Sequence, residues 1–416
     1  MTLKVDLRQV IHALADALDL VGVDDVAHGK RVGVMAAECG RGAGLPAGEV
    51  AFLFELGMLH DIGVSSTRVH GHLVESFDWS GAQAHCQVGY ERLRGFAPLA
   101  EMALPILYHH TRWDALQAIS LPARSKRQVN LIYLVDRVDA LAAPHYGDKA
   151  LLLFTDEIRA RIAEHAGTFF SPELVELFLD ASHTEAFWLD LEPRSIQARM
   201  VESLATARDY PANTDELKHL AGIFARIVDA KSPFTAEHSL GVARLARHLA
   251  ERLGVSPDNC DKLEIAGMLH DLGKLRVPDE ILDKPGRLDA AERKIINTHS
   301  YETFQILHGI RGFDEITRWA AYHHEEPDGS GYPFHLTAAE MPFEAAILRV
   351  ADIFQAMVQE RPYRQGLGDT EVSNFIRRMA DDGRIDSRVA EVLLEDVPAA
   401  RLAACPALED LPEVRV

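Results

Sequence analysis

The chain has 416 residues and a formal net charge of −20, and its residues are 47% hydrophobic and 25% charged. This balance is typical of a soluble globular protein and excludes a largely disordered or fibrous chain, while the length favours two or three domains. The negative charge argues against general binding to DNA or RNA duplexes and to anionic membranes, because those surfaces need neutralising lysine and arginine side chains.

The cysteines and the N-terminal segment bear on the compartment. The four cysteines lie far apart with no CxxC pair, so we expect neither a disulfide framework nor a thiolate zinc site, and a cytoplasmic location fits best. Lys4, Asp6 and Arg8 interrupt the first segment, and no later run of about 18 apolar residues occurs. We therefore expect neither a signal peptide nor a membrane anchor.

A repeated motif divides the chain into two similar halves. GMLHDIG at Gly57–Gly63 returns as GMLHDLG at Gly267–Gly273. A single HD dipeptide would mean nothing, whereas several matching positions in the same order indicate a tandem duplication. The further pairs, at a nearly fixed offset, are His28 with His238, His60 with His270, His85 with His299, His109 with His323, His110 with His324, and Asp136 with Asp352.

Hydrophobic residues recur with helical spacing in the second half, as at Leu217, Leu220, Phe224 and Ile227, and no run alternates as a strand does. The repeat extends this pattern to the first half. The sequence thus predicts an all-α fold class, with two tandem helical bundles joined by a short linker. We expect an N-terminal domain over residues 1–190, a linker over 191–215, a second domain over 216–400 and a C-terminal tail over 401–416.

The recurring histidines and aspartates are typical metal ligands. Hydrolysis of a phosphodiester near neutral pH needs a strong nucleophile and a means of absorbing charge on the phosphoryl oxygens, and two adjacent divalent ions supply both. Any one of these histidines alone would more often be a surface or core residue, but their joint recurrence favours a metal site. The second half offers His238, His270, Asp271, His299, His323, His324 and Asp352.

These ligands are expected at helix ends. Neighbouring residues on a helix point about 100° apart, so His270 and Asp271 reach one centre only beside a helix end or an irregular turn. Gly273 fits such an end, and the His323–His324 doublet likewise precedes the Gly-rich segment PDGSGYP. Ligands from several helix ends would converge inside a bundle.

The chain resembles the HD superfamily of metal-dependent phosphohydrolases, and its second half resembles the HD-GYP family. The motifs that carry the resemblance occur in the family's order over about residues 217–394. They are HDLGK from His270, PDEILDKPGRL from Pro278, HHEEPDGSGYP from His323 and RPYR from Arg361. The first half resembles a plainer HD domain.

The resemblance implies an all-helical fold with a di-iron or di-manganese centre that opens cyclic di-GMP to pGpG, and in some members continues to GMP. Asp271 would bridge the ions, and a metal-bridging hydroxide would attack phosphorus in line. The second-half histidines and aspartates named above would be the ligands. Members with a third ion carry an acidic residue four positions before the first histidine, where this chain has Phe234, so two ions are implied.

The resemblance also implies substrate contacts. Lys274 would stabilise the phosphoryl charge or protonate the leaving ribose oxygen, although a lysine at this position could also be an ordinary surface residue. Arg361 and Arg364, three residues apart, would clamp the second phosphate. The predicted lip of the substrate pocket is Gly331, Tyr332 and Pro333.

The first half keeps a candidate second metal site but loses the substrate residues. Val64 stands where the second half has Lys274, and TRWD follows the histidine doublet. A structural domain, a phosphohydrolase for another substrate and a metal or ligand sensor are three alternatives, of which regulation or scaffolding ranks first. The candidate ligands are His28, His60, Asp61, His85, His109, His110 and Asp136.

The sequence leaves the substrate, the metal and the partners open. Cyclic di-GMP is the expected substrate, with 3′,3′-cyclic GMP-AMP as the alternative within the enzyme class and a non-hydrolysing cyclic-dinucleotide binding module as the alternative outside it. Histidine and carboxylate ligands suit several ions, with iron or manganese expected. A homodimer and a signalling partner protein are both left open.

Overall fold

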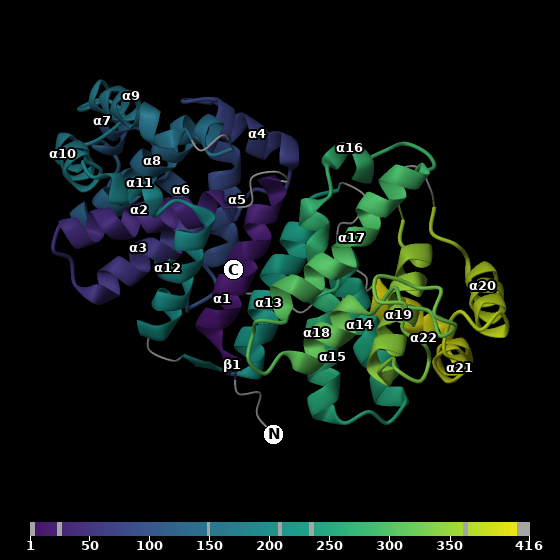
Figure 1. The fold of residues 1–416 in the computed structure, drawn as a ribbon. Coiled ribbons are helices and arrows are strands. Elements are labelled where there is room, and N and C mark those ends of the chain that lie inside the picture. The colour runs from purple at the N-terminus through teal and green to yellow at the C-terminus, as the bar shows by residue number, and fades with distance from the viewer. Residues whose placement is uncertain are drawn as a thin grey trace. The chain divides into compact units, whose positions relative to one another are not determined.

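The computed structural model describes residues 5–22, 27–147, 150–206, 210–232, 237–360 and 365–405. Within these residues the fold is helical apart from one two-stranded antiparallel sheet, which pairs β1 (Val5–Asp6) with β2 (Pro211–Ala212). The structure therefore confirms the predicted all-α fold class (Figure 1). The chain forms two compact units, which we call the N-terminal unit (Leu18–Asp209) and the C-terminal unit (Met1–Ala17 with Tyr210–Val416).

The division differs from the expected one at the start of the chain. Residues 1–17 were expected in the N-terminal domain, but they group with the C-terminal unit. Hydrogen bonds account for this grouping: Leu7 N donates to Tyr210 O at 2.9 Å, and Arg311 N donates to the side-chain oxygen of Gln9 at 3.1 Å. A two-residue ladder has no recognisable sequence pattern, so the sequence could not indicate it.

The N-terminal unit is a bundle built around α2, α3 and α8, which pack against one another. Helix α1 (Leu7–Asp19) crosses the boundary between the units. The helices that follow are α2 (His28–Gly42), α3 (Ala47–Leu59), α4 (Thr67–Glu75), α5 (Gln83–Leu93), α6 (Ala100–Tyr108), α7 (Trp113–Leu116), α8 (Ala123–Ala142), α9 (Leu151–Ala163), α10 (Pro172–Ala181), α11 (Glu185–Leu189) and α12 (Pro193–Thr206), with 3₁₀ turns η1 (Leu20–Gly22) and η2 (Ala143–His145).

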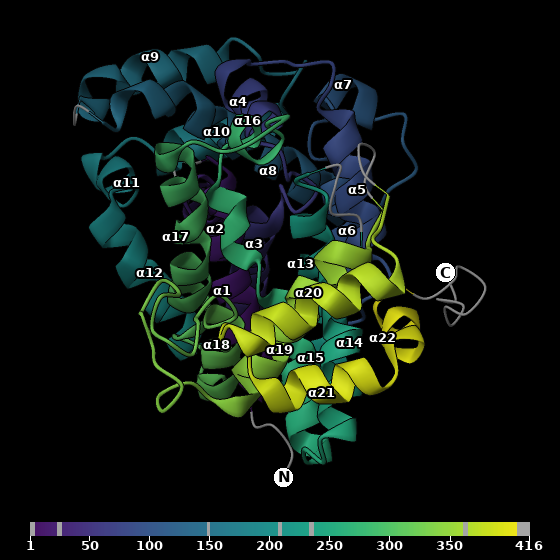
Figure 2. The same cartoon turned by 90° about the vertical axis from the view of Figure 1, so that its right-hand side faces the viewer.

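The C-terminal unit repeats this plan around α14, α15 and α19. Its helices are α13 (Thr214–Asp229), α14 (His238–Arg252), α15 (Pro257–Leu269), α16 (Asp279–Leu282), α17 (Ala290–Leu307), α18 (Asp314–Ala321), α19 (Phe343–Val358), α20 (Asp369–Asp381), α21 (Ser387–Glu395) and α22 (Val397–Ala404), with the 3₁₀ turn η3 (Leu272–Arg276) after α15. Figure 2 shows α20, α21 and α22 gathered beside α19. Because α22 packs on α14, the residues up to Ala404 belong to the bundle, not to a tail.

Local sequence signals explain where these helices begin and which face they bury. Asn213 caps α13 and forms a capping box with Glu216, and Asp289 does the same for α17 with Glu292. The stripe predicted from spacing lies in the core: Leu217, Leu220, Phe224 and Ile227 are all buried. The helical periodicity was therefore a sound guide to the core face of α13.

The first glycine of each repeated segment, GMLHDIG and GMLHDLG, allows close helix packing. A Cβ atom on Gly267 would lie 2.7 Å from Ala243 Cα in α14, and one on Gly57 would lie 2.5 Å from Gly33 Cα in α2. The last glycine of each motif similarly meets a backbone oxygen, that of His299 for Gly273 and that of His85 for Gly63. The two glycines of each segment thus let the turn that carries the His–Asp pair pack closely against the helices that supply other ligands.

We expect Gly267→Ala to destabilise the protein by about 1–3 kcal/mol, because the added methyl group overpacks a helix contact made of backbone atoms. Urea denaturation of the purified protein measures this. Gly309→Ala is the matched control, because no described atom lies within 4 Å of a Cβ placed there. Equal stability of the two variants would contradict the packing argument.

Candidate metal centres

The C-terminal unit brings its predicted ligands together from separate elements. His238 is the first residue of α14, and His270 and Asp271 lie between the end of α15 and the start of η3. His299 lies within α17, Asp352 lies within α19, and the doublet His323–His324 follows the end of α18. The HD pair and the doublet thus sit at helix ends, which is where the spacing argument places them.

The side chains form two groups with Asp271 between them. His238, His270 and Asp352 offer ligand atoms within 4.8 Å of one another, and so do His299, His323 and His324. The Oδ2 atom of Asp271 lies 3.6 Å from His238 Nε2 and 3.3 Å from His270 Nε2. Its Oδ1 atom lies 3.4 Å from His299 Nε2 and 3.8 Å from His323 Nε2. One carboxylate therefore faces both groups, one oxygen to each.

Hydrogen bonds to Nδ1 orient the imidazoles. His270 Nδ1 lies 2.7 Å from Gly267 O, His299 Nδ1 lies 2.7 Å from Ile296 O, and His323 Nδ1 lies 2.6 Å from Ala320 O. His238 Nδ1 instead lies 2.5 Å from the side-chain oxygen of Gln355. Each bond directs Nε2 toward the shared centre, as outer hydrogen bonds do in metal sites.

The electrostatics favour the forms that bind metal. Burial lowers the pKa of His323 and His324, and neighbouring imidazoles lower it further. Burial would raise the pKa of Asp271, but His270 and Lys274 hold it well below the usual range. For His270, in contrast, burial lowers the pKa but the attraction of Asp271 outweighs it and raises the pKa. The ionised Asp271 and the neutral imidazoles of His323 and His324 are thus in the forms that bind metal, whereas His270 would have to lose a proton when metal binds.

Two buried atoms at this centre make no hydrogen bond among the described residues, and a bound cation would interact with both. His270 Nε2 and Asp271 Oδ1 are buried and have no hydrogen-bond partner among the described residues. A buried polar atom without a partner is costly. The donor set of imidazole nitrogens and carboxylate oxygens suits divalent transition metals. The residues present therefore fit a metal centre.

Lys274 reaches this centre from η3. Its Nζ atom lies 2.5 Å from Asp271 Oδ2, and its side chain is 24% exposed whereas that of Asp271 is 3% exposed. Burial works to lower the pKa of Lys274, but the attraction of Asp271 outweighs it and raises the pKa. Lys274 is thus a charged group between the buried ligands and solvent.

The Gly331–Pro333 segment lies over the histidine doublet. The rings of Tyr332 and His324 are 4.8 Å apart, and Tyr332 N donates to His324 O at 3.2 Å. A Cβ atom on Gly331 would collide with the backbone of Glu325 and Glu326, so only glycine fits there. The predicted substrate residues Arg361 and Arg364, and the position of Phe234, lie outside the described residues.

Sequence reasoning missed two glutamates that hold this segment. The fully buried Glu325 accepts hydrogen bonds from Phe334 N at 2.7 Å and Leu336 N at 2.9 Å. Glu326 pairs with Arg349 and Arg384, each at 2.8 Å. Both glutamates follow the histidine doublet directly, but the sequence does not indicate which groups they bind.

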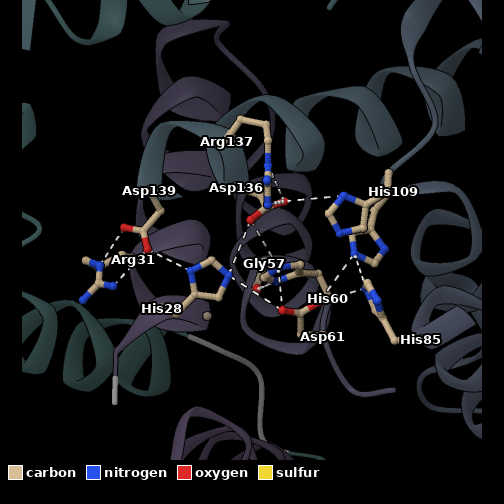
Figure 3. Close-up of polar contacts among 12 residues, drawn as sticks. His28, Arg31, Gly57, His60, Asp61, His85, His109, Asp136, Arg137 and Asp139 are labelled. Carbon is tan, nitrogen blue, oxygen red and sulfur yellow. Dashed lines mark hydrogen bonds and ion pairs between the residues drawn. The ribbon is translucent and has the colours of Figure 1, made fainter. Parts of the chain in front are cut away.

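The N-terminal unit assembles the corresponding residues in the same pattern (Figure 3). Asp61 Oδ1 lies 3.1 Å from His85 Nε2 and 3.6 Å from His109 Nε2, and its Oδ2 lies 3.8 Å from His28 Nε2 and 3.5 Å from His60 Nε2. His110 groups with Asp61, His85 and His109 within 4.8 Å. Asp136 Oδ1 completes the other side, 3.5 Å from His28 Nε2.

The surroundings of this second centre differ from those of the first. The buried Val64 replaces Lys274, and Arg137 donates to Asp136 Oδ2 at 2.8 Å. The Cys86 thiol lies 3.7 Å from His85 Nε2, where Ser300 lies 3.3 Å from His299 Nε2 in the C-terminal unit. The two centres thus have the same types of candidate ligand, and they differ in the residues that contact those ligands.

The chain is similar to known proteins over most of its length. Residues 222–389 match the family model described as "HD domain". The chain is 38% identical over 398 residues to the 3′3′-cGAMP-specific phosphodiesterase 1 of Vibrio cholerae serotype O1, covering 94% of this chain and 92% of the relative. It is 33% identical over 203 residues to the cyclic di-GMP phosphodiesterase response regulator of Xanthomonas campestris, covering 48% of this chain and 52% of the relative.

A solved structure has the same fold. The crystal structure of a cyclic GMP-AMP specific phosphodiesterase of Vibrio cholerae superposes with a TM-score of 0.63 at 24% identity, covering 98% of this chain and 99% of that one. This likeness shows the fold, and the 38% identity over nearly the whole chain shows the family. The chain belongs to the HD-GYP family of cyclic-dinucleotide phosphodiesterases, within the HD superfamily of metal-dependent phosphohydrolases.

Among the described residues, no helix has both the length and the apolar character needed to cross a membrane.

Proposed function

We propose that the C-terminal unit hydrolyses a 3′,3′-cyclic dinucleotide at a pair of divalent metal ions, iron or manganese. The observation that carries this proposal is the placement of Asp271, whose two oxygens face two separate groups of histidines. Two such ions, when bound, activate water and neutralise charge on the phosphoryl oxygens. In this arrangement His238, His270 and Asp352 would hold one ion, His299, His323 and His324 would hold the other, and Asp271 would contribute to both sites.

The chain's own residues have separate tasks in this proposal. Lys274, charged and partly exposed beside Asp271, stabilises negative charge on the phosphoryl group or donates a proton to the leaving ribose oxygen. Gly331, Tyr332 and Pro333 shape the lip of the substrate pocket beside His324. Arg361 and Arg364 are proposed to bind the second phosphate by bidentate contacts.

The substrate is either cyclic di-GMP or 3′,3′-cyclic GMP-AMP. Relatives named for cyclic di-GMP support the first, and the response regulator covers 48% of this chain. The relative named for 3′3′-cGAMP covers 94% of the chain, including the N-terminal unit. That whole-chain similarity is the specific observation that favours 3′,3′-cyclic GMP-AMP as a second candidate.

A competition assay tests both candidates. Full-length protein reconstituted with Mn²⁺ or Fe²⁺ receives equal amounts of the two dinucleotides, and chromatography follows each substrate and its linear product. The ratio of the two rates is the ratio of kcat/KM values and identifies the preferred substrate. Binding of either dinucleotide without turnover under both metals would replace the enzyme proposal with a binding module.

We propose a regulatory or scaffolding role for the N-terminal unit, and a cytoplasmic location for the protein. The unit keeps candidate ligands but has Val64 in place of Lys274 and no counterpart of the GYP sequence. Turnover by the paired variants His60→Ala with Asp61→Ala and His270→Ala with Asp271→Ala tests this assignment. Loss of turnover in the first pair comparable to that in the second would contradict it.

A further inference from the structure

The side chain behind His28 in the N-terminal unit is a carboxylate. His28 Nδ1 lies 2.8 Å from Asp139 Oδ2, and both residues are buried. At the corresponding position of the C-terminal unit, the neutral side chain of Gln355 accepts from His238. Asp139 lies one helical turn after Asp136 on α8, as Gln355 lies one turn after Asp352 on α19. The two centres thus differ by one charge directly behind an equivalent imidazole.

Asp139 is held in place by hydrogen bonds from Arg31 and Tyr146. Arg31 donates to its two oxygens, at 2.6 Å from Nε and 2.9 Å from Nη2, as Figure 3 shows. The Tyr146 hydroxyl also donates to Asp139, at 2.6 Å. Arg31 is buried, and its guanidinium lies 4.1 Å from the centre of the Tyr146 ring. In the C-terminal unit Gly241 stands where Arg31 does here. The carboxylate, its arginine and its tyrosine therefore form a set specific to the N-terminal unit.

The buried Asp139 carboxylate is surrounded by donors, namely two N–H groups of Arg31, the Tyr146 hydroxyl and the imidazole of His28. Hydrogen bonds and a guanidinium of this kind favour the ionised form of a carboxyl group. An ionised acceptor makes a stronger hydrogen bond than a neutral amide. When the imidazole N–H points to a carboxylate, the opposite nitrogen becomes a more basic ligand and the ring is fixed in one orientation. That opposite atom, His28 Nε2, faces Asp61 and Asp136.

His28, His60, Asp61 and Asp136 match the ligand set of the HD superfamily and would hold a divalent metal ion in the N-terminal unit. We propose that Asp139 is a positioning residue, specific to this unit, that strengthens His28 as a ligand of that ion. A second observation independently points to a cation: His60 Nε2 is buried beside these residues and has no hydrogen-bond partner in the described part of the chain. This site is distinct from the one proposed to carry the reaction. Its existence does not depend on the substrate or on turnover.

Mn²⁺ binding to full-length protein tests the proposal. In a His270→Ala, Asp271→Ala background, which disables the C-terminal centre, Mn²⁺ is titrated and the free ion is measured by electron paramagnetic resonance. Asp139→Asn keeps the shape and removes the charge, and it should weaken the tight Mn²⁺ site about tenfold, the lower end of the range for outer-shell changes. Tyr146→Phe is the control, because it leaves the carboxylate and Arg31 in place, and its affinity should stay within about twofold of the background.

A reciprocal change tests the same charge in the other unit. Gln355→Glu is isosteric, and in a His60→Ala, Asp61→Ala background it should tighten Mn²⁺ binding by the C-terminal centre about tenfold. If circular dichroism shows that Asp139→Asn fails to fold, the Gln355→Glu experiment alone tests whether a carboxylate behind the histidine strengthens metal binding. Absence of a tight Mn²⁺ site in the first background would overturn the proposal. So would an Asp139→Asn variant that folds and binds Mn²⁺ as tightly as its parent, or a Gln355→Glu variant with unchanged affinity, because a purely structural ion pair would leave metal affinity unaltered.

Discussion

Asp271→Ala is expected to strip metal from the C-terminal unit and to lower kcat/KM by about a thousandfold or more. Its two oxygens lie 3.3 Å from His270 Nε2 and 3.4 Å from His299 Nε2, so this one substitution removes a ligand from both histidine groups. Metal charge stabilisation is worth several kcal/mol, and each 1.4 kcal/mol or so is a factor of ten in rate. Metal analysis after dialysis and turnover at saturating Mn²⁺ measure the two effects.

Asp61→Ala is the matched control, because Asp61 occupies the same place among the histidines of the N-terminal unit. It should lower the metal content of the protein while most turnover remains. Unchanged turnover in Asp271→Ala would show that the chemistry does not occur at this centre. Equal loss of turnover in both variants would contradict the assignment of catalysis to the C-terminal unit.

Lys274→Ala is expected to lower kcat by about a hundredfold to a thousandfold, the usual cost of removing one group that stabilises transition-state charge. Lys274 contacts Asp271 Oδ2 with its ammonium group but contributes no ligand atom to either histidine group. Metal content should therefore stay at the wild-type level. Steady-state kinetics and metal analysis on the same preparation separate the two quantities.

Lys262→Ala provides the comparison for a lysine in the same unit. Lys262 lies on α15 about two turns before His270 and pairs with Glu315 of α18 at 2.5 Å, and its removal should leave kcat nearly unchanged. If Lys274→Ala lost metal in proportion to activity, its role would be to hold Asp271 and not to act on substrate. A kcat equal to that of Lys262→Ala would remove Lys274 from the mechanism.

The repeated motif allowed much of the C-terminal centre to be predicted. His270, Asp271 and the His323–His324 doublet recur in the first half, and the local rule that adjacent helical residues diverge placed them at helix ends. The structure brings them within ligand distance of His238, His299 and Asp352. These ligands could be predicted because residue type and residue order identify them, and a sequence contains both directly.

The roles of Glu325 and Asp139 could not be predicted in this way. Glu325 accepts bonds from backbone N–H groups of Phe334 and Leu336, and such acceptors have no sequence signature. Asp139 matters because α8 faces α2, where it meets His28 and Arg31 across more than a hundred residues of chain. Long-range pairs of this kind depend on helix packing.

The sequence by itself determined the helical class, the duplication and the set of candidate ligands, because each follows from local periodicity or from the order of residue types. Only the tertiary structure decided which group lies behind each imidazole, and that residues 1–17 join the C-terminal unit. The physical reason is the same in both cases. Hydrogen bonds between segments distant in sequence form only after the helices have packed, and the residues that make them carry no pattern of their own.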